Sequence, residues 1–159
     1  MERKGIRVGG IIHARGLALI GIVAGPDRPG IIAAVFRALG EAGLNAQFIV
    51  QSVDLNNDTH VQFCVAAEDR ERVLEALRPV AERLDAQRLT EGRRVALLSI
   101  YGPDFRERPG IAGEAFGTLA ECGVNILAVS TSISTISCVV EEDQGERALD
   151  MLHRVFVLP

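Results

Sequence analysis

Aromatic side chains and excess positive charge are both scarce in this 159-residue sequence, which has six Phe, one Tyr and no Trp. Its 17 Lys and Arg are outnumbered by 21 Asp and Glu, so the formal net charge is −4. A protein that binds a nucleic-acid backbone needs a basic face, and one that binds single strands needs aromatic rings for base stacking. The composition therefore predicts that no nucleic acid is a partner.

Long apolar runs and cysteine motifs are also missing. The apolar stretch after the basic N-terminal residues covers only 8–12, which is too short for a secretory signal or a membrane span. Cys64, Cys122 and Cys138 form no C-x-x-C pair and lie in apolar contexts, which favours buried reduced thiols. We therefore expect no membrane association and a cytoplasmic location.

Catalytic signatures are absent as well. The sequence has no G-x-x-x-x-G-K-[ST] loop, no G-x-G-x-x-G turn and no H-E-x-x-H pair. His13, His60 and His153 lack metal-ligand spacing, which favours surface or strand-edge positions. Carboxylates gather at 68–82 and 141–143, where solvated helix faces explain them better than an acid–base pair. We expect no catalytic residue, no metal and no cofactor.

What the sequence does contain is a repeat. Arg28–Ile31 (RPGI) recurs as Arg108–Ile111, an offset of 80 residues, and ten of the 25 positions from 28 to 52 are identical at that offset. The other matched pairs are Phe36 with Phe116, Leu39 with Leu119, Glu41 with Glu121, Gly43 with Gly123, Asn45 with Asn125 and Ser52 with Ser132. The chain is therefore two copies of one unit of about 80 residues.

Each copy predicts alternating strands and helices. In the first copy, Pro29 and Gly30 open a helix that ends at Gly43, and Pro79 predicts a kink or a break in a second helix. The predicted strands are 17–23, 46–53, 59–66 and 87–90, and the second helix carries Val73, Leu77, Val80 and Leu84. This βαββαβ order is the ferredoxin-like pattern.

The second copy lacks its last strand. Its predicted strands are 95–101, 124–130 and 135–141, and its helices are 110–122 and one carrying Leu149, Leu152 and Phe156. Residues 157–159 are too short for a sixth element, whereas 6–13 is an extra N-terminal strand. We predict an α+β fold of two ferredoxin-like units, in which the N-terminal strand completes the second sheet. The predicted domains are 15–92, and 1–14 plus 93–159.

One loop of the first copy suits a small zwitterion. Gly25–Gly30 joins a strand to a helix N-terminus, where free N–H groups and the helix dipole favour a carboxylate. Gly30 lets a ligand approach the backbone, Pro29 fixes the loop, and Asp27 is suited to an ammonium group. The loop thus predicts recognition of a free α-amino acid. The alternative is that Asp27 only caps the helix and Pro29–Gly30 only forms a turn.

Amide side chains mark two further places. Gln51 lies near the end of an apolar strand, and Asn125 follows Gly123-Val124, with Asn45 at the equivalent place in the first copy. These amides are candidates for polar contacts to a ligand. For the two Asn residues, turn chemistry after a helix-ending glycine is the alternative.

These motifs carry a family resemblance. Residues 21–53 (GIVAGPDRPGIIAAVFRALGEAGLNAQFIVQSV) resemble the first ACT domain of aspartate kinases, with its V-P-D-[KR]-P-G, F-x-x-L-[AG]-E-A-x-[IL]-N and I-V-Q progression. Residues 108–142 resemble the second ACT domain, including its S-T-S, and 147–156 (RALDMLHRVF) are similar to the C-terminal helix. The resemblance covers nearly the whole chain.

The resemblance implies regulation. The kinase signature K-F-G-G-[TS] does not occur in the sequence, so the chain is similar to a regulatory β-subunit or an isolated regulatory region. The implied function is feedback control by threonine or lysine, bound where ACT units pair side by side. The implied partners are a second copy, joined through sheets and helices, and the catalytic subunit of an aspartate kinase.

The resemblance also implies site residues. The effector site would use Asp27, Pro29, Gly30, Ile31, Ile32 and Gln51, with Asn125 and Ile126 closing it from a partner's second unit. A second site would use Asn45, Arg106, Thr131 and Ser132.

Two departures from the family pattern bear on the effector. The family often has S-T-S-E, but Ile133 replaces that Glu, which weakens the case for lysine and favours threonine. Arg108 stands where His is common, although Arg106 matches a family arginine. One alternative is a stand-alone ACT-pair sensor that regulates a different protein. Another is an acylphosphatase-like enzyme cradling phosphate with Arg106 or Arg108, which the missing glycine-rich anion loop disfavours.

Overall fold

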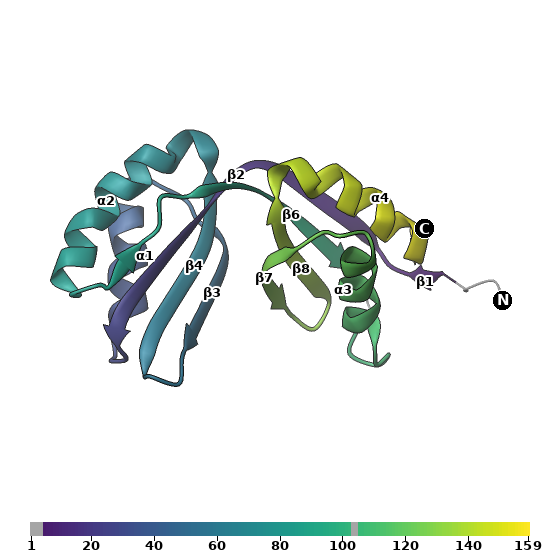
Figure 1. The fold of residues 1–159 in the computed structure, drawn as a ribbon, viewed down its shortest axis with the longest axis horizontal. Coiled ribbons are helices and arrows are strands. Elements are labelled where there is room, and N and C mark those ends of the chain that lie inside the picture. The colour runs from purple at the N-terminus through teal and green to yellow at the C-terminus, as the bar shows by residue number, and fades with distance from the viewer. Residues whose placement is uncertain (1–4, 103–104) are drawn as a thin grey trace. The chain divides into compact units, whose positions relative to one another are not determined.

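A computed structural model of the chain describes residues 5–102 and 105–159, which form two compact units. The first unit is Gly16–Arg94, and the second unit combines Met1–Arg15 with Val95–Pro159. The first boundary falls at Gly16, whose φ of 65° is a left-handed conformation that glycine adopts without a Cβ penalty. In each unit the helices cover one face of an antiparallel sheet (Figure 1).

The first unit has the sheet order β3-β4-β2-β5. Its elements are β2 (Gly10–Pro26, from Gly16 onward), α1 (Ile31–Glu41), β3 (Gln47–Val53), β4 (Asp58–Ala66), a 3-10 turn (Ala67–Asp69), α2 (Arg70–Arg83) and β5 (Arg88–Leu89). Ile20 and Ile22 of β2 and Phe63 of β4 are fully buried in one core with Val35 and Leu39 of α1. Because successive strand residues point to opposite faces, this alternation fixes which face of the sheet the helices cover.

The second unit has the order β7-β8-β6-β2, so the N-terminal part of β2 takes the place that β5 has in the first unit. Its elements are β6 (Arg93–Tyr101), α3 (Ile111–Glu121), β7 (Ile126–Thr131), β8 (Thr135–Glu141), a 3-10 turn (Glu142–Gln144) and α4 (Gly145–Val155). In addition, β1 (Ile6–Arg7) pairs in parallel with β9 (Phe156–Val157). The predicted α+β class with two ferredoxin-like units is confirmed.

Close packing explains Gly9, just before β2, and Gly10, its first residue. A Cβ on Gly9 would lie 2.9 Å from Cε2 of Tyr101, and one on Gly10 would overlap the same ring. The N–H of Gly9 donates to the carbonyl of Tyr101 at 2.7 Å. The backbone of this strand therefore lies directly against the tyrosine ring.

The structure corrects three expectations about single elements. The break at Pro79 is wrong, because α2 runs uninterrupted from Arg70 to Arg83. Pro79 is exposed, so the carbonyl that loses its N–H partner lies on the solvent side of the helix. Phe156 lies not in the last helix but in β9, which provides a short sixth element after all. Residues 10–13 of the predicted N-terminal strand are continuous with the first strand of the first copy in one 17-residue strand, β2, whereas Ile6–Arg7 form β1. Within the described residues, no helix is long and apolar enough to cross a bilayer.

Candidate functional site

Asp27 is held by the return strand of its own unit. It follows the end of β2, and its N–H donates to the carbonyl of Asn57 at 2.7 Å. The hydroxyl of Thr59, the second residue of β4, donates to Oδ1 of Asp27 at 3.0 Å. Thr59 is fully buried whereas Asp27 is exposed. The carboxylate is thus anchored on one oxygen and presented to solvent.

The helix start beside Asp27 is open. The N-cap residue of α1 is Gly30, with a φ of 99° and no side-chain cap hydrogen bond. The alternative that Asp27 caps this helix is therefore wrong. Among the described residues, no atom beyond its chain neighbours lies within 4 Å of a Cβ built on Gly30, so a ligand can approach the backbone closely. The N–H of Ala34 donates to the carbonyl of Gly30 at 2.9 Å. The N–H groups before it in the first turn of α1 have no acceptor within the helix, so they remain available to an anion.

Gln51 lies on the same face of the first unit as Thr59. In the β3–β4 register, Val53 pairs with Thr59 and Gln51 pairs with Val61. Side chains two residues apart on a strand point to the same face, and Thr59 and Val61 are both buried on the helix side. The structure therefore brings Asp27, Thr59 and Gln51 to one face of one unit. Ile31 is buried in the core below, and Ile32 is half-buried.

The two Asn residues lie at equivalent exposed places in different units. Asn45 follows Leu44, whose N–H donates to Leu39 at 2.9 Å, and Asn125 follows Val124, whose N–H donates to Leu119 at 2.9 Å. In both copies the preceding glycine, not the Asn, takes the left-handed conformation that ends the helix. Ile126, the first residue of β7, is half-buried against the second core.

The second unit carries the equivalent of this site as a cavity of about 230 Å³. We call it the β7-side cavity. Residues Gly110, Ile111 and Thr131, which line it, correspond to Gly30, Ile31 and Gln51 at the 80-residue offset. Ser132 and Arg108 also line it. Of the predicted second site, Thr131 and Ser132 thus come together, whereas Arg106 is not in the lining and Asn45 belongs to the first unit.

The sequence predicted neither the hydrogen bond from Thr59 to Asp27 nor the position of Arg108 in the wall of the β7-side cavity. Thr59 is 32 residues from Asp27, and nothing in the local pattern links them. A signal existed, because Thr59, Val61, Phe63 and Val65 alternate onto the buried face and only the first of them is polar. A buried hydroxyl needs a partner, so this position pointed to a specific contact.

Two buried thiols and one exposed carboxylate have shifted pKa values. Burial raises the pKa of Cys64 and of Cys138 to about 12, which keeps these thiols protonated and unreactive. All three cysteines are free and buried. At the β3–β4 tip, hydrogen bonds from the backbone of Asp58 and from His60 lower the pKa of Asp54. Among the residues described, no group of three His, Cys, Asp or Glu could hold a metal.

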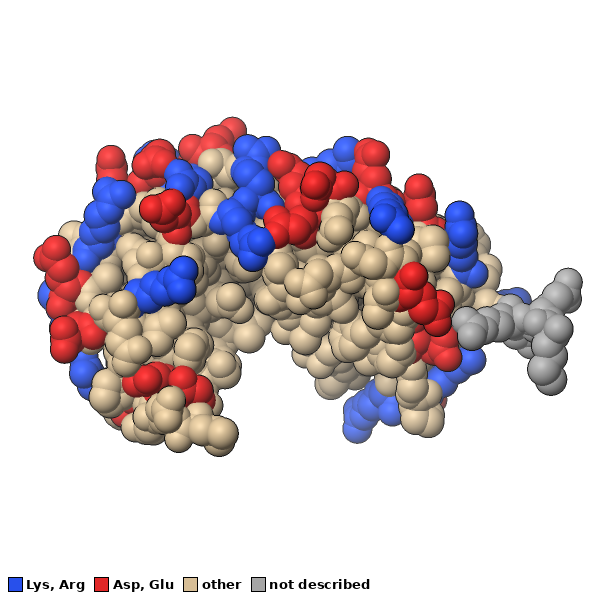
Figure 2. Space-filling view, viewed as in Figure 1, with Lys and Arg blue, Asp and Glu red and all other residues tan. Residues whose placement is uncertain are grey.

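Charge is distributed unevenly over each unit. Charged side chains gather over helices α2 and α4 (Figure 2). In contrast, β3 (QFIVQSV) and β7 (ILAVST), the outermost strands of their sheets, contain no charged residue. Ile49, Val53 and Val129 on these strands are each at least 40% exposed. An uncharged strand edge with free backbone groups is suited to pairing with another strand.

Comparison with known families matches both units to the same domain. The ACT domain family matches residues 18–84 and, independently, residues 98–156. An aspartokinase from Mycolicibacterium smegmatis is 30% identical over 151 residues, which cover 94% of this chain and 36% of that protein. An aspartokinase from Thermus thermophilus is 33% identical over 143 residues, which cover 89% of this chain and 35% of that protein. The chain thus spans about a third of the length of the curated relatives it matches.

Solved structures match the chain over nearly its full length. The ligand-free regulatory subunit of aspartate kinase from Thermus thermophilus is 32% identical, with a TM-score of 0.82 over 93% of this chain and 97% of that one. A structure of aspartokinase alpha and beta subunits gives a TM-score of 0.82 at 30% identity, with the same coverage.

Proposed function

This chain belongs to the ACT-domain family of aspartate kinase regulatory chains, and on that premise we propose that it binds a free amino acid and thereby controls an aspartate kinase. The observation that carries the proposal is the open start of α1 beside an anchored, exposed carboxylate. A free N-terminal helix turn attracts a carboxylate, and Asp27 attracts an ammonium group. An α-amino acid has both groups on one carbon.

The proposal gives each residue of the site a part. The first N–H groups of α1 bind the effector's carboxylate, and Gly30 leaves space for that approach. Asp27 accepts from the ammonium group while Thr59 holds its other oxygen. Gln51, two residues along β3 from the partner of Thr59, contacts the effector side chain. Asn125 and Ile126 contribute from another unit in an assembly of chains.

Threonine is the favoured effector, with lysine second. A lysine effector needs a carboxylate for its side-chain ammonium group, and the family's Glu after S-T-S is replaced here by Ile133. Ile133 is 66% exposed at the β7–β8 tip and offers no charge. Thr131 and Ser132 in the β7-side cavity offer hydroxyls, which suit a hydroxylated side chain.

The proposal includes assembly. The uncharged outer strands β3 and β7 pair with a second copy of the chain, and the helices extend the contact. The effector then stabilises one arrangement of units over another, and that difference reaches the kinase. Couplings of this kind are typically about 1–3 kcal/mol, or about 5- to 150-fold in affinity. The chain works in the cytoplasm with an aspartate kinase catalytic subunit.

Calorimetric titration with threonine and lysine tests the proposal. We expect threonine to bind the wild-type chain, and Asp27→Asn and Gln51→Ala to weaken that binding without lowering the melting temperature. Asp143→Asn, an exposed carboxylate before α4, is the matched control and should leave affinity unchanged. Equal affinity in Asp27→Asn and wild type would refute the site. If threonine inhibits an aspartate kinase catalytic subunit equally with and without this chain co-expressed, the regulatory function is refuted.

A further inference from the structure

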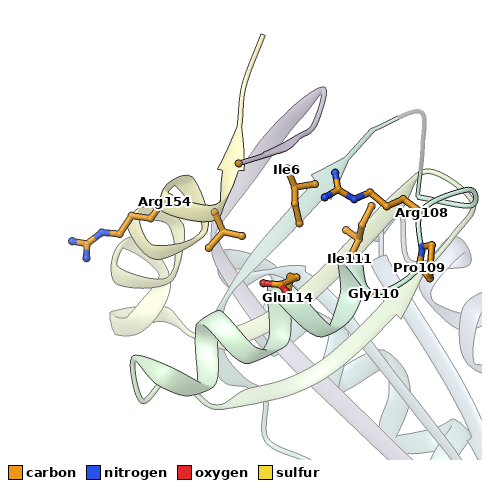
Figure 3. Close-up of a pocket in the computed structure, with 9 residues that line it drawn as sticks. Ile6, Arg108, Pro109, Gly110, Ile111, Glu114 and Arg154 are labelled. Atoms are coloured by element: carbon orange, nitrogen blue, oxygen red, sulfur yellow. The ribbon is translucent and has the colours of Figure 1, made fainter. Parts of the chain in front are cut away.

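A second cavity borders the RPGI loop of the second unit, on the side of β1 and α4. It has a volume of about 250 Å³, and we call it the α4-side cavity. Its walls come from three parts of the chain: Ile6 at the N-terminal strand, Arg108 to Glu114 at the start of α3, and Val155 at the end of α4 (Figure 3). Its loop residues Arg108, Pro109, Gly110 and Ile111 also line the β7-side cavity, and none of its residues belongs to the first-unit site.

Opposite charges face this cavity without neutralising one another. The guanidinium of Arg108 extends from the loop toward Ile6, and the Glu114 carboxylate lies on the α3 wall (Figure 3). Within residues 5–102 and 105–159, neither side chain forms an ion pair. Arg154 contributes only its stem, because its guanidinium points away from the cavity (Figure 3). One cation and one anion are therefore available to a ligand.

The rest of the lining is aliphatic. Ile6 and Ile111 belong to the core of the second unit and are 7% and 4% exposed, and Val155 packs against the same core. Liquid water occupies about 30 Å³ per molecule, so a cavity of this volume corresponds to about eight waters. It suits a ligand of about eight to ten non-hydrogen atoms, below the range of about 300–1,000 Å³ for drug-sized ligands.

We propose that the α4-side cavity binds a free amino acid with an aliphatic side chain. Arg108 binds its carboxylate, Glu114 binds its ammonium group, and the side chain packs against Ile6, Ile111 and Val155. This site uses none of Asp27, Thr59 and Gln51 of the first-unit effector site and does not depend on them. Arg108 also lines the β7-side cavity. One guanidinium cannot bind a carboxylate in both places, so ligands of the two cavities compete through this residue.

The test titrates the full chain with L-isoleucine and with its two single-ended analogues. The probe 3-methylpentanoate lacks the ammonium group, and 2-methylbutylamine lacks the carboxylate. We expect L-isoleucine to bind and both analogues to bind about ten-fold more weakly or worse, because each loses a charge-assisted hydrogen bond. In methyl NMR spectra, the signals of Ile6 and Ile111 should shift with L-isoleucine. Absence of these shifts, or equal affinity for 3-methylpentanoate, would overturn the proposal.

Variants of α3 locate the ammonium contact. Glu114→Gln should weaken L-isoleucine about ten-fold and leave 3-methylpentanoate unchanged. Glu121→Gln removes the same charge from the last turn of α3, outside the cavity, and should change neither. Glu114→Asp keeps the charge and should lose less affinity than Glu114→Gln, which separates charge from folding. Unchanged L-isoleucine binding in Glu114→Gln would disprove the assignment.

The two proposed sites fail independently. Asp27→Asn should weaken threonine and leave L-isoleucine unchanged, whereas Glu114→Gln should do the opposite. If threonine binding is lost only in Asp27→Asn and L-isoleucine never binds, the effector site stands and the α4-side site is wrong. If both ligands respond only to Glu114→Gln, the α4-side site stands and the first-unit site is wrong.

Discussion

Two loops with the same RPGI sequence are built differently in the two units. In the first unit β2 ends at Pro26 and α1 begins at Ile31, whereas in the second β6 ends at Tyr101 and α3 begins at Ile111. Both helices start after a glycine N-cap with positive φ, 99° at Gly30 and 90° at Gly110. The shared tetrapeptide thus fixes the helix start.

Loop length and neighbouring strands decide what each helix start presents to a ligand. In the short first loop, the hydroxyl of Thr59 holds the Asp27 carboxylate by a hydrogen bond. The longer second loop places Arg108, the counterpart of Arg28, between two cavities. Two copies of one motif can therefore diverge in ligand while conserving the backbone that receives it. The following tests probe how far the two units are equivalent.

The largest expected effect comes from emptying the same core position in each unit. Leu39→Ala and Leu119→Ala, 80 residues apart, remove side chains that are at most 1% exposed. Each should lower the free energy of unfolding by about 2–5 kcal/mol in urea denaturation. Hydrogen exchange should rise mainly in the unit that carries the change. Leu55→Ala, at a fully exposed tip, is the control and should stay within about 0.5 kcal/mol. If only one of the two variants lowers the free energy of unfolding by less than about 1 kcal/mol, the two units are not equivalent at this core position.

A glycine specific to the second unit should give the next largest effect. A Cβ on Gly145 would lie 2.7 Å from Nε2 of His13 and 2.9 Å from Cβ of Ala96. Gly145→Ala should therefore cost about 1–3 kcal/mol through overpacking. Gly117→Ala lies in the interior of α3, where no described atom beyond the helix's own backbone comes within 4 Å of the added Cβ, and should instead stabilise by up to about 1 kcal/mol. Thermal unfolding of both variants checks the opposite signs, and a neutral Gly145→Ala would refute the close approach.

Thr59 should have a smaller effect on stability and a clear one on the effector. Thr59→Val keeps the shape and removes the hydrogen bond to Asp27, which should cost about 1 kcal/mol. Threonine binding should weaken because the carboxylate is no longer held. Thr118→Val removes a buried hydroxyl from the second unit, where it donates to the carbonyl of Glu114 at 2.7 Å, and should leave threonine affinity unchanged. Calorimetry of the two variants side by side decides whether Thr59 positions Asp27.

The smallest effect should be a pH dependence located in the second unit. Nε2 of His13 is buried and has no hydrogen-bond partner among the described residues, and burial together with Arg15 lowers its pKa below 6.5, against the pull of Glu146. The unfolded chain then takes up a proton before the folded one does. This contribution to stability is complete above about pH 6.5 and is lost as the pH falls through that value. His13→Gln should flatten the melting temperature between pH 8 and pH 5, and the exposed His153→Gln should not. Parallel profiles for wild type and His13→Gln would contradict this.

The repeat made most of the fold predictable. In each copy, RPGI marks the start of the first helix, and the glycine that follows the helix, Gly43 or Gly123, marks its end. The strand hairpins followed from alternation, as in the buried series Thr59, Val61 and Phe63. Elements whose state depends on distant partners could not be predicted. Phe156 is a strand residue because it pairs with Ile6, and α2 tolerates Pro79 because that side of the helix is exposed.

The candidate site likewise has residues that the local sequence predicts and contacts that it does not. Asp27 and Gly30 could be chosen from the loop alone, since a glycine, a proline and an acid before a helix have local meanings. The hydroxyl that holds Asp27 comes from a strand 32 residues away, and sequence spacing does not reveal that contact. Arg108 was visible as a charge, but its position between two cavities requires the backbones of β1, α4 and β7 together.

The split second unit has a consequence for the order in which the chain is made. Ile6 and Val8 belong to the second core, yet 79 residues, Gly16–Arg94, are synthesised between them and the rest of that core. The first unit is complete once residue 94 has left the ribosome, and it can fold as translation continues. The N-terminal strand meanwhile has no partner, and its edge stays open until β6 is made. This strand thus precedes the first unit in the chain yet is secured only after that unit is made, and for that interval its open edge is exposed to wrong pairing.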